Sequence, residues 1–233
     1  MKILALETST EYCSVALWQD GIILARNELV GQKHSERLMP MLHDLLSEAG
    51  GRLLQCDGIA FGSGPGSFTG VRIACGVAQG LALGAGLPVL GITTLLALAE
   101  GTGHGRVIAA LDARMGEIYC AAYEKQDEGW KTVCEPVLCK PEEAPVVKDC
   151  GWFGAGSGFA AHREVLQGRY AKNMTGMDAV VVPGASSIAA LAALQFARGL
   201  GMDAAYAQPF YLRDKVALKT AERELIAAEH PQK

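Results

Sequence analysis

The chain has 233 residues, half of them hydrophobic, with 28 glycines and a formal net charge of −4. This length can bury one large core or two small ones, and the apolar content excludes an intrinsically disordered chain. The acidic balance argues against a broad basic surface, so we expect the chain alone to bind RNA poorly.

Cysteine usage and the apolar runs favour a cytoplasmic protein without a membrane span. The seven cysteines are odd in number and form no Cys-x-x-Cys pair, which fits reduced thiols better than a disulfide framework. Glu7 interrupts the first apolar run, so we expect no secretory signal. Residues 73–99 carry no charge, but Pro88 and several glycines interrupt them, and we predict a buried helix, a turn, a strand and the start of another helix.

The N-terminal residues read as three strands joined by short turns. Apolar runs predict strands at 2–6, 13–18 and 22–28, with a hairpin turn between the last two. The polar turn after the first strand carries Glu7, Thr8 and Ser9, and in this layout its hydroxyls and carboxylate point into a cleft. An ordinary capped turn is an equally good interpretation of the three residues.

Two predicted helices, at 34–49 and 68–85, carry more apolar residues than one contact with a sheet requires. Ser35 is a plausible cap for the first helix. Glycines repeat every four residues in the second helix, which gives it a smooth face. Burial inside one fold explains the excess, and a subunit interface built from both helices is the sharper alternative. The candidate partner or dimer interface consists of Leu38, Met41, Leu42, Leu45, Val71, Ala74, Val77, Ala78 and Leu81.

A glycine-rich string at 62–76 follows an apolar run at 58–61 and leads into the second of these helices. A strand, a glycine-rich turn and a helix N-terminus can together cradle an anion, although the string is not a Walker A loop. A tight turn whose small residues permit close packing is the alternative. Ser67 or Thr69 can cap the helix. The possible residual anion or nucleotide cleft comprises Glu7, Thr8, Ser9, Gly64, Gly66, Ser67, Thr69 and Asp112.

The pattern restarts after residues 101–105, so we predict domains at 1–103 and 104–213 and a charged tail at 214–233. Strands at 107–111 and 118–123 flank a polar turn with Asp112, which repeats the opening layout and indicates an internal duplication. An alanine-rich helix at 186–200 is predicted, which could pack back on the first domain, and a solvated helix covers 214–229.

Chemistry-bearing motifs are sparse. The five histidines form no His-x-x-x-His or His-Glu-x-x-His pair, and no nucleophile elbow is present. Glu7 and Asp112, which lie in the polar turns after the first strand of each predicted domain, are the acidic candidates for Mg²⁺. A structural role in turn hydrogen bonding is at least as good an interpretation, so we predict no metal site.

Several stretches together resemble the TsaB (YeaZ) family, bacterial partner proteins of TsaD in threonylcarbamoyladenosine modification of tRNA. They are residues 3–17, the string at 64–74, the segment 112–119 and the late segment 209–213. The resemblance spans nearly the whole chain. It implies the two-domain α/β fold shared by actin, sugar kinases and heat-shock ATPases (the ASKHA fold), with a reduced second domain.

The resemblance also implies that catalysis is absent. The catalytic relative TsaD carries a His-x-x-x-His metal motif at positions that fall here on Thr94 and Leu98, and leucine cannot ligate a metal. The family thus implies a non-catalytic scaffold that binds TsaD, and the pair then recruits TsaE. TsaC is also needed, tRNA is contacted only indirectly, and the chain alone pairs as a homodimer. It needs no cofactor of its own, since ATP, Mg²⁺ and metal are expected on partner subunits.

Two enzyme hypotheses remain open. A small-molecule kinase or ATPase of the same fold would place Glu7 and Asp112 on Mg²⁺ and the 64–70 turn on phosphate. A metallopeptidase is the third hypothesis, and the residues at 94 and 98 argue against it.

Overall fold

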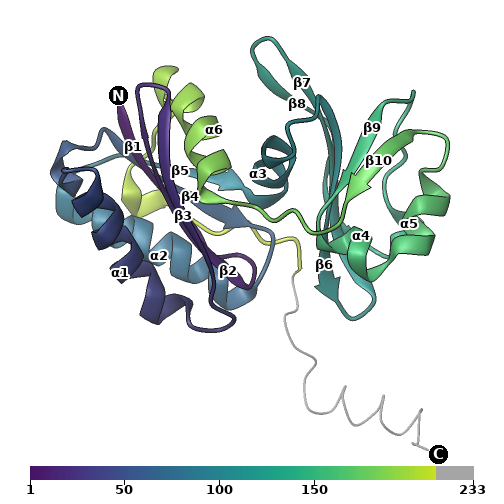
Figure 1. The fold of residues 1–233 in the computed structure, drawn as a ribbon, viewed down its shortest axis with the longest axis horizontal. Helices are drawn as coiled ribbons and strands as arrows, with labels where there is room; N and C mark the ends of the chain where they lie inside the picture. The colour runs from purple at the N-terminus through teal and green to yellow at the C-terminus, as the bar shows by residue number, and fades with distance from the viewer. Residues whose placement is uncertain (214–233) are drawn as a thin grey trace, which may run out of the picture.

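Two five-stranded mixed sheets form the frame of the molecule, in a computed structural model that describes residues 1–213 (Figure 1). The predicted tail at 214–233, with its helix, lies outside the described residues. In the first sheet the strand order is β3-β2-β1-β4-β5. Its strands are β1 (Lys2–Glu7), β2 (Tyr12–Gln19), β3 (Ile22–Leu29), β4 (Gly58–Gly64) and β5 (Val89–Thr93).

The second sheet repeats the connectivity of the first, as the recurring sequence pattern indicated. In each sheet the first strand is central, two strands follow it antiparallel on one side, and two parallel strands complete the other side. The order of the second sheet is β10-β9-β6-β7-β8. Its strands are β6 (Arg106–Arg114), β7 (Glu117–Gln126), β8 (Gly129–Cys139), β9 (Trp152–Ala155) and β10 (Met174–Asp178).

Helices cover both faces of the first sheet. α1 and α2 pack on the outer face, α6 packs on the face turned toward the second lobe, and α3 lies between the lobes (Figure 1). α4 and α5 belong to the second lobe. The helices are α1 (His34–Glu48), α2 (Phe68–Ala85), α3 (Thr94–Gly101), α4 (Ser157–Ala161), α5 (Arg163–Arg169) and α6 (Ala185–Ala197), with short 3-10 turns η1 (Leu53–Gln55), η2 (Pro141–Glu143) and η3 (Ala204–Tyr206).

Side-chain alternation in β1 explains how one strand serves two cores. Leu4 and Leu6 point into the cluster under α1 and α2, whereas Ile3 and Ala5 point into the cluster under α6. All four are fully buried. A strand buried on both faces is a continuous apolar run, which is why the sequence shows no polar alternation there.

The helix starts differ from the sequence prediction in one place. α1 begins at His34, and Lys33 at its N-cap makes no side-chain cap hydrogen bond, so Ser35 lies inside the helix and the predicted cap is wrong. The His34 ring is buried, and its Nε2 lies 3.2 Å from the carbonyl oxygen of Tyr12, which ties the first turn to β2. Ser67 caps α2 as expected, because its hydroxyl accepts a hydrogen bond from the Gly70 N–H at 3.3 Å.

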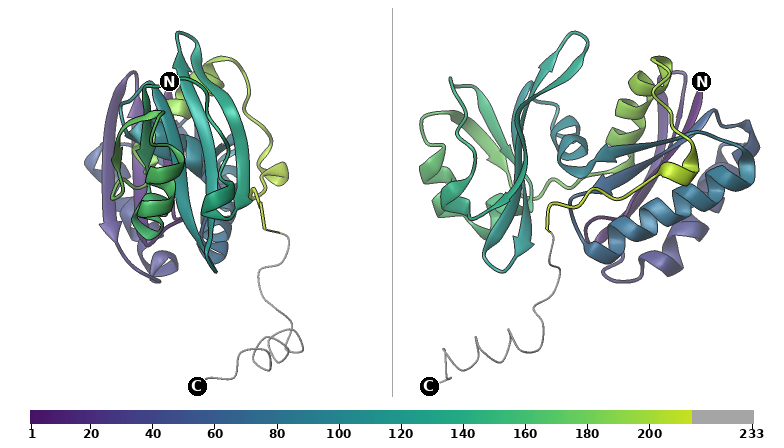
Figure 2. Two further views of the ribbon diagram at one scale, coloured as in Figure 1. Left: turned by 90° about the vertical axis from the view of Figure 1, so that its right-hand side faces the viewer. Right: turned by 180° about the vertical axis from the view of Figure 1, so that it is seen from behind.

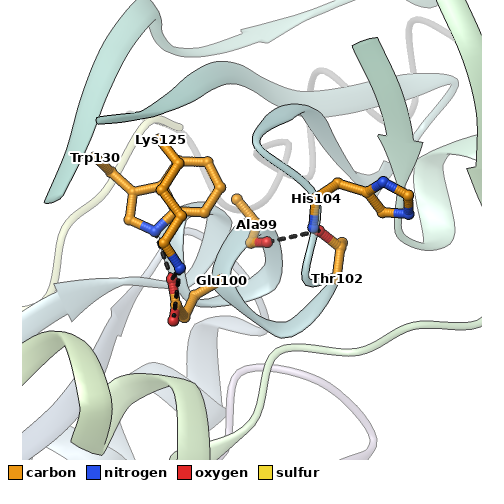
Figure 3. Close-up of polar contacts among 6 residues, drawn as sticks. All are labelled: Ala99, Glu100, Thr102, His104, Lys125 and Trp130. Atoms are coloured by element: carbon orange, nitrogen blue, oxygen red, sulfur yellow. Dashed lines mark hydrogen bonds and ion pairs between the residues drawn. The ribbon is translucent and has the colours of Figure 1, made fainter. Parts of the chain in front are cut away.

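Contacts on two sides of the molecule join the lobes, besides the points where the chain crosses between them. At the end of α3, Glu100 accepts hydrogen bonds from the Trp130 indole at 2.5 Å and from the Lys125 ammonium at 3.0 Å (Figure 3). Trp130 packs against the cores of both lobes. On the other side, the segment after η3 runs from α2 to the second lobe (Figure 2). There Arg213 pairs with Glu117 at 2.7 Å.

α2 is, within residues 1–213, the one helix long and apolar enough to cross a membrane by length and composition. Core helices of globular proteins pass the same test. Here one side of α2 packs on β4, and Ala74, Ala78 and Ala82 are buried in the core under it.

Candidate functional site

A cleft of about 1160 Å³ lies between the two lobes. Six segments line it: the turn after β1, the connection from β3 to the start of α1, the glycine-rich turn and the start of α2, the turn between β6 and β7, α4, and residues 210–213. The walls therefore come from both lobes, and the late segment closes one side.

The structure brings together five of the eight residues predicted for a residual anion or nucleotide cleft. Ser9, Gly66, Ser67, Thr69 and Asp112 line the cleft. The other three, Glu7, Thr8 and Gly64, are buried behind it and are not part of its lining.

Glu7 is buried beneath the turn, with 1% of its surface exposed. Its Oε1 accepts a hydrogen bond from the Ser9 N–H, and its Oε2 has no partner among the described residues. Because burial disfavours the charged form, the pKa of Glu7 rises to about 7. A carboxyl group in this position is a poor Mg²⁺ ligand, since it faces protein rather than the cleft.

The glycines of the glycine-rich turn make room for the turn after β1. A Cβ at Gly62 would overlap the carboxylate of Glu7, and a Cβ at Gly70 would overlap the carbonyl oxygen of Thr8. Gly66 lies over Ser9 in the same way, and the Ser67 N–H donates to the Ser9 carbonyl at 2.7 Å. The arrangement favours the close-packing interpretation of these glycines over an anion cradle, because the chain itself fills the space that they leave.

Asp112 lies on the opposite wall and is held by its own turn. Its Oδ1 accepts a hydrogen bond from the Arg114 N–H at 2.9 Å, and its Oδ2 lies 3.2 Å from the Arg114 guanidinium. Asp112 and Glu7 do not converge on one point of the cleft, so the residues present do not fit a Mg²⁺–nucleotide complex. Within residues 1–213, no three His, Cys, Asp or Glu side chains are grouped to hold a metal ion.

An arginine and two aromatic rings form a cluster at the mouth of the cleft. The guanidinium of Arg72 lies 3.6 Å from the centre of the Phe68 ring, and its Nε donates to the Tyr211 hydroxyl at 2.7 Å. The aromatic centroids are 5.8 Å apart. The contact between Tyr211 and Arg72 could not be predicted from local sequence, because 139 positions separate the two residues.

Most of the predicted interface residues on α1 and α2 are buried in the chain's own core. These seven side chains are at most 4% exposed, so they cannot contact a partner while the lobe is folded: Leu38, Met41, Leu42, Leu45, Val71, Ala74 and Ala78. Val77 and Leu81 are half-buried. Their apolar excess exists because α1 and α2 must cover β1, β2 and β4 together, and this corrects the assignment of the seven to a free surface.

α2 nevertheless has an exposed face of small residues. Gly76 and Gly80 are exposed, and a Cβ built at either would meet no atom within 4 Å. Leu83 on the same face is 62% exposed. Another helix could approach the α2 backbone closely along this face.

Comparison with known proteins gives the family. A family model described as "TsaD: tRNA N6-adenosine threonylcarbamoyltransferase" matches residues 23–221. The tRNA threonylcarbamoyladenosine biosynthesis protein TsaB of Escherichia coli is 41% identical over 227 residues, which cover 94% of this chain and 97% of that protein. The chain belongs to the TsaB family.

Another TsaB relative and two solved structures match more than nine tenths of the chain. The Haemophilus influenzae TsaB is 38% identical, with 94% of this chain and 96% of the relative covered. The solved structure of YeaZ from Pseudomonas aeruginosa superimposes with a TM-score of 0.82 at 43% identity, covering 91% of this chain and 99% of that one. A second Pseudomonas aeruginosa structure, described as similar to the peptidase YEAZ, gives a TM-score of 0.85, also at 43% identity, with 91% of this chain and 99% of that one covered. The fold is thus the actin-like α/β fold that the resemblance implied.

The two positions that were predicted to correspond to a TsaD metal motif are buried in this TsaB-family chain. Thr94 and Leu98 stand four residues apart on α3, and neither is exposed at all. Leu98 packs among the apolar residues between α3 and the second sheet. These side chains offer no pair of ligands for a metal.

Proposed function

We propose that this TsaB-family chain is a non-catalytic subunit that binds a TsaD-family transferase, and that the modification of tRNA requires it. The complex would transfer a threonylcarbamoyl group to the adenosine beside the anticodon. The observation that carries the proposal is the open face of α2, because it offers a close docking surface on a relative of the transferase itself.

The exposed side of α2, rather than its buried stripe, is the partner surface in this proposal. Gly76 and Gly80 allow two helix backbones to approach, and neighbouring Val77, Leu81 and Leu83 supply partly exposed apolar area. Burying one leucine there stabilises the complex by roughly 1.5–3 kcal/mol. The same face would pair with itself as a homodimer when the transferase is absent.

The absence of catalysis is inferred from the site chemistry. Thr94 and Leu98 supply no metal ligand pair, and Glu7 is turned away from the cleft. We therefore assign ATP, Mg²⁺ and the metal to partner subunits. TsaE would bind the assembled pair, TsaC would act alongside, tRNA would meet this chain only indirectly, and the complex would work in the cytoplasm.

A small-molecule kinase or ATPase is the second candidate, and the cleft volume of about 1160 Å³ is the observation that favours it. That function predicts ATP turnover by the isolated chain, abolished by Glu7→Gln. The metallopeptidase hypothesis has no ligand set to support it among the described residues.

A glycine substitution tests the partner surface directly. Gly80→Arg should abolish co-purification with the TsaD protein of the same organism, because the long side chain blocks close helix approach. The fold should be kept, since no atom lies within 4 Å of the added Cβ and arginine favours helix over glycine. Gly168→Arg on α5 is the matched control, because that glycine is equally open. Wild-type yield of the complex with Gly80→Arg would overturn the assignment of this surface.

A further inference from the structure

Arg72 is held on the exposed side of α2 by neutral groups instead of an acid. One face of its guanidinium stacks on Phe68 at 3.6 Å, and its Nε is engaged by the Tyr211 hydroxyl at 2.7 Å. Within residues 1–213 no carboxylate oxygen lies within 4 Å of it. Among the described residues, the guanidinium is held in position without a carboxylate partner.

The other arginines around the cleft are already paired. Arg114 lies 3.2 Å from Asp112, and Arg213 lies 2.7 Å from Glu117. Among the three arginines named here, within residues 1–213, Arg72 is the one without a carboxylate partner. Nucleic-acid backbones are bound by several cations that each release counterions, so one isolated arginine fits a single carboxylate better than RNA.

The edge of the Arg72 guanidinium that carries Nη1 and Nη2 can accept a ligand. Nε is occupied, while Nη1 and Nη2 have no hydrogen-bond partner in the described part of the chain. This pair of nitrogens matches the two oxygens of a carboxylate. Stacking and the Tyr211 hydrogen bond fix the plane beforehand, so less side-chain entropy is lost on binding.

We propose that Arg72 is the charged anchor of the α2 partner surface and binds an Asp or Glu side chain of the docked protein. The inference rests on the proposed function. Arg72 stands four residues before Gly76, and Gly80 follows by four more, so all three lie on one exposed side of α2. A helix lying over the two glycines passes beside Arg72, and the ion pair fixes the register in which it lies.

The test is the affinity for the cognate TsaD protein, measured by calorimetry at low and high salt. Arg72→Gln should weaken binding at least about tenfold at low salt and Arg72→Glu further, with unchanged melting temperatures. The salt dependence of binding should fall in Arg72→Gln. Arg163→Gln on α5 makes the same charge change at an exposed site and should bind as the wild type does. Replacing the contacting acid of TsaD by Lys should restore binding to Arg72→Glu.

The alternatives give different patterns. If Gly80→Arg abolishes binding but Arg72→Gln retains wild-type affinity and salt dependence, the surface stands and the anchor is wrong. If neither change affects binding, the exposed side of α2 is not the surface that binds TsaD, and the proposed function loses its supporting observation. If Arg72→Gln leaves TsaD binding intact but weakens the binding of tRNA to the assembled complex, the ligand is a phosphate and the carboxylate proposal is overturned.

Discussion

Burial raises the pKa of Glu7 to about 7, so this carboxyl group changes charge near neutral pH. The carboxyl group lies behind the cleft wall, over Gly62, where the glycine leaves space for it. Its folded form prefers to be protonated, because the charged form would leave Oε2 without a partner. We therefore expect the Glu7 carboxyl group to affect the free energy of unfolding rather than catalysis.

Stability should fall as pH rises through the range of this titration. Below pH 4.5 the carboxyl is protonated in both states, and between about 4.5 and 7 the folded protein keeps a proton that the unfolded chain releases. The free energy of unfolding then decreases by up to about 3 kcal/mol. Glu7→Gln should flatten this slope in denaturant titrations at several pH values, whereas Glu11→Gln at an exposed site should retain it. A wild-type slope in Glu7→Gln would contradict the account.

At the scale of single residues, the sequence predicted the polar turn after β1 and the Ser67 cap of α2. It did not predict which distant residues these groups contact. Ser67 caps α2 because the signal is local, one hydroxyl and an N–H three residues on. The orientation of Glu7 depends on a glycine 55 positions later, and the Arg72–Tyr211 contact joins residues 139 apart. Such pairings are set by the tertiary fold and leave no trace in local spacing.

At the scale of elements, hydrophobic patterning predicted α1, α2 and the strands β1, β2, β3, β6 and β7 to within a few residues. The period shows that a face is apolar but not what covers it, which is why buried positions such as Leu45 were assigned to a partner surface. α5 and β10 were not predicted. β10 is a half-buried strand containing Gly176, without alternation, and its structure depends on pairing with β9.

Substitutions on α1 separate its two faces. Leu45→Asp should destabilise the fold by at least about 3 kcal/mol, because an unpaired charge would replace a leucine with no exposed surface. Met39→Asp on the same helix, where the side chain is 47% exposed, should change stability by less than about 1 kcal/mol. Urea denaturation followed by circular dichroism compares the two. A stable, dissociated Leu45→Asp variant would restore the original interface assignment.

The whole molecule consists of two related lobes, and contacts on two sides of the cleft join them. α3 and the Glu100–Trp130 contact close one side (Figure 3), and the late segment ending in Arg213 closes the other (Figure 2). Asp112 lines the cleft between the lobes and Glu7 does not, and the α3 residues Thr94 and Leu98 are buried. The exposed side of α2, with its open glycines, is the surface on which the proposed docking role rests.

The most direct test of this account is an omission assay for the modified adenosine. The chain is combined with TsaD, TsaC, TsaE, ATP, threonine, bicarbonate and tRNA, and each protein is left out in turn. The account predicts that modification disappears when this chain is omitted, and that the chain alone hydrolyses no ATP. Modification without it, or ATP turnover by the isolated chain, would contradict the non-catalytic subunit and favour an enzyme of the same fold.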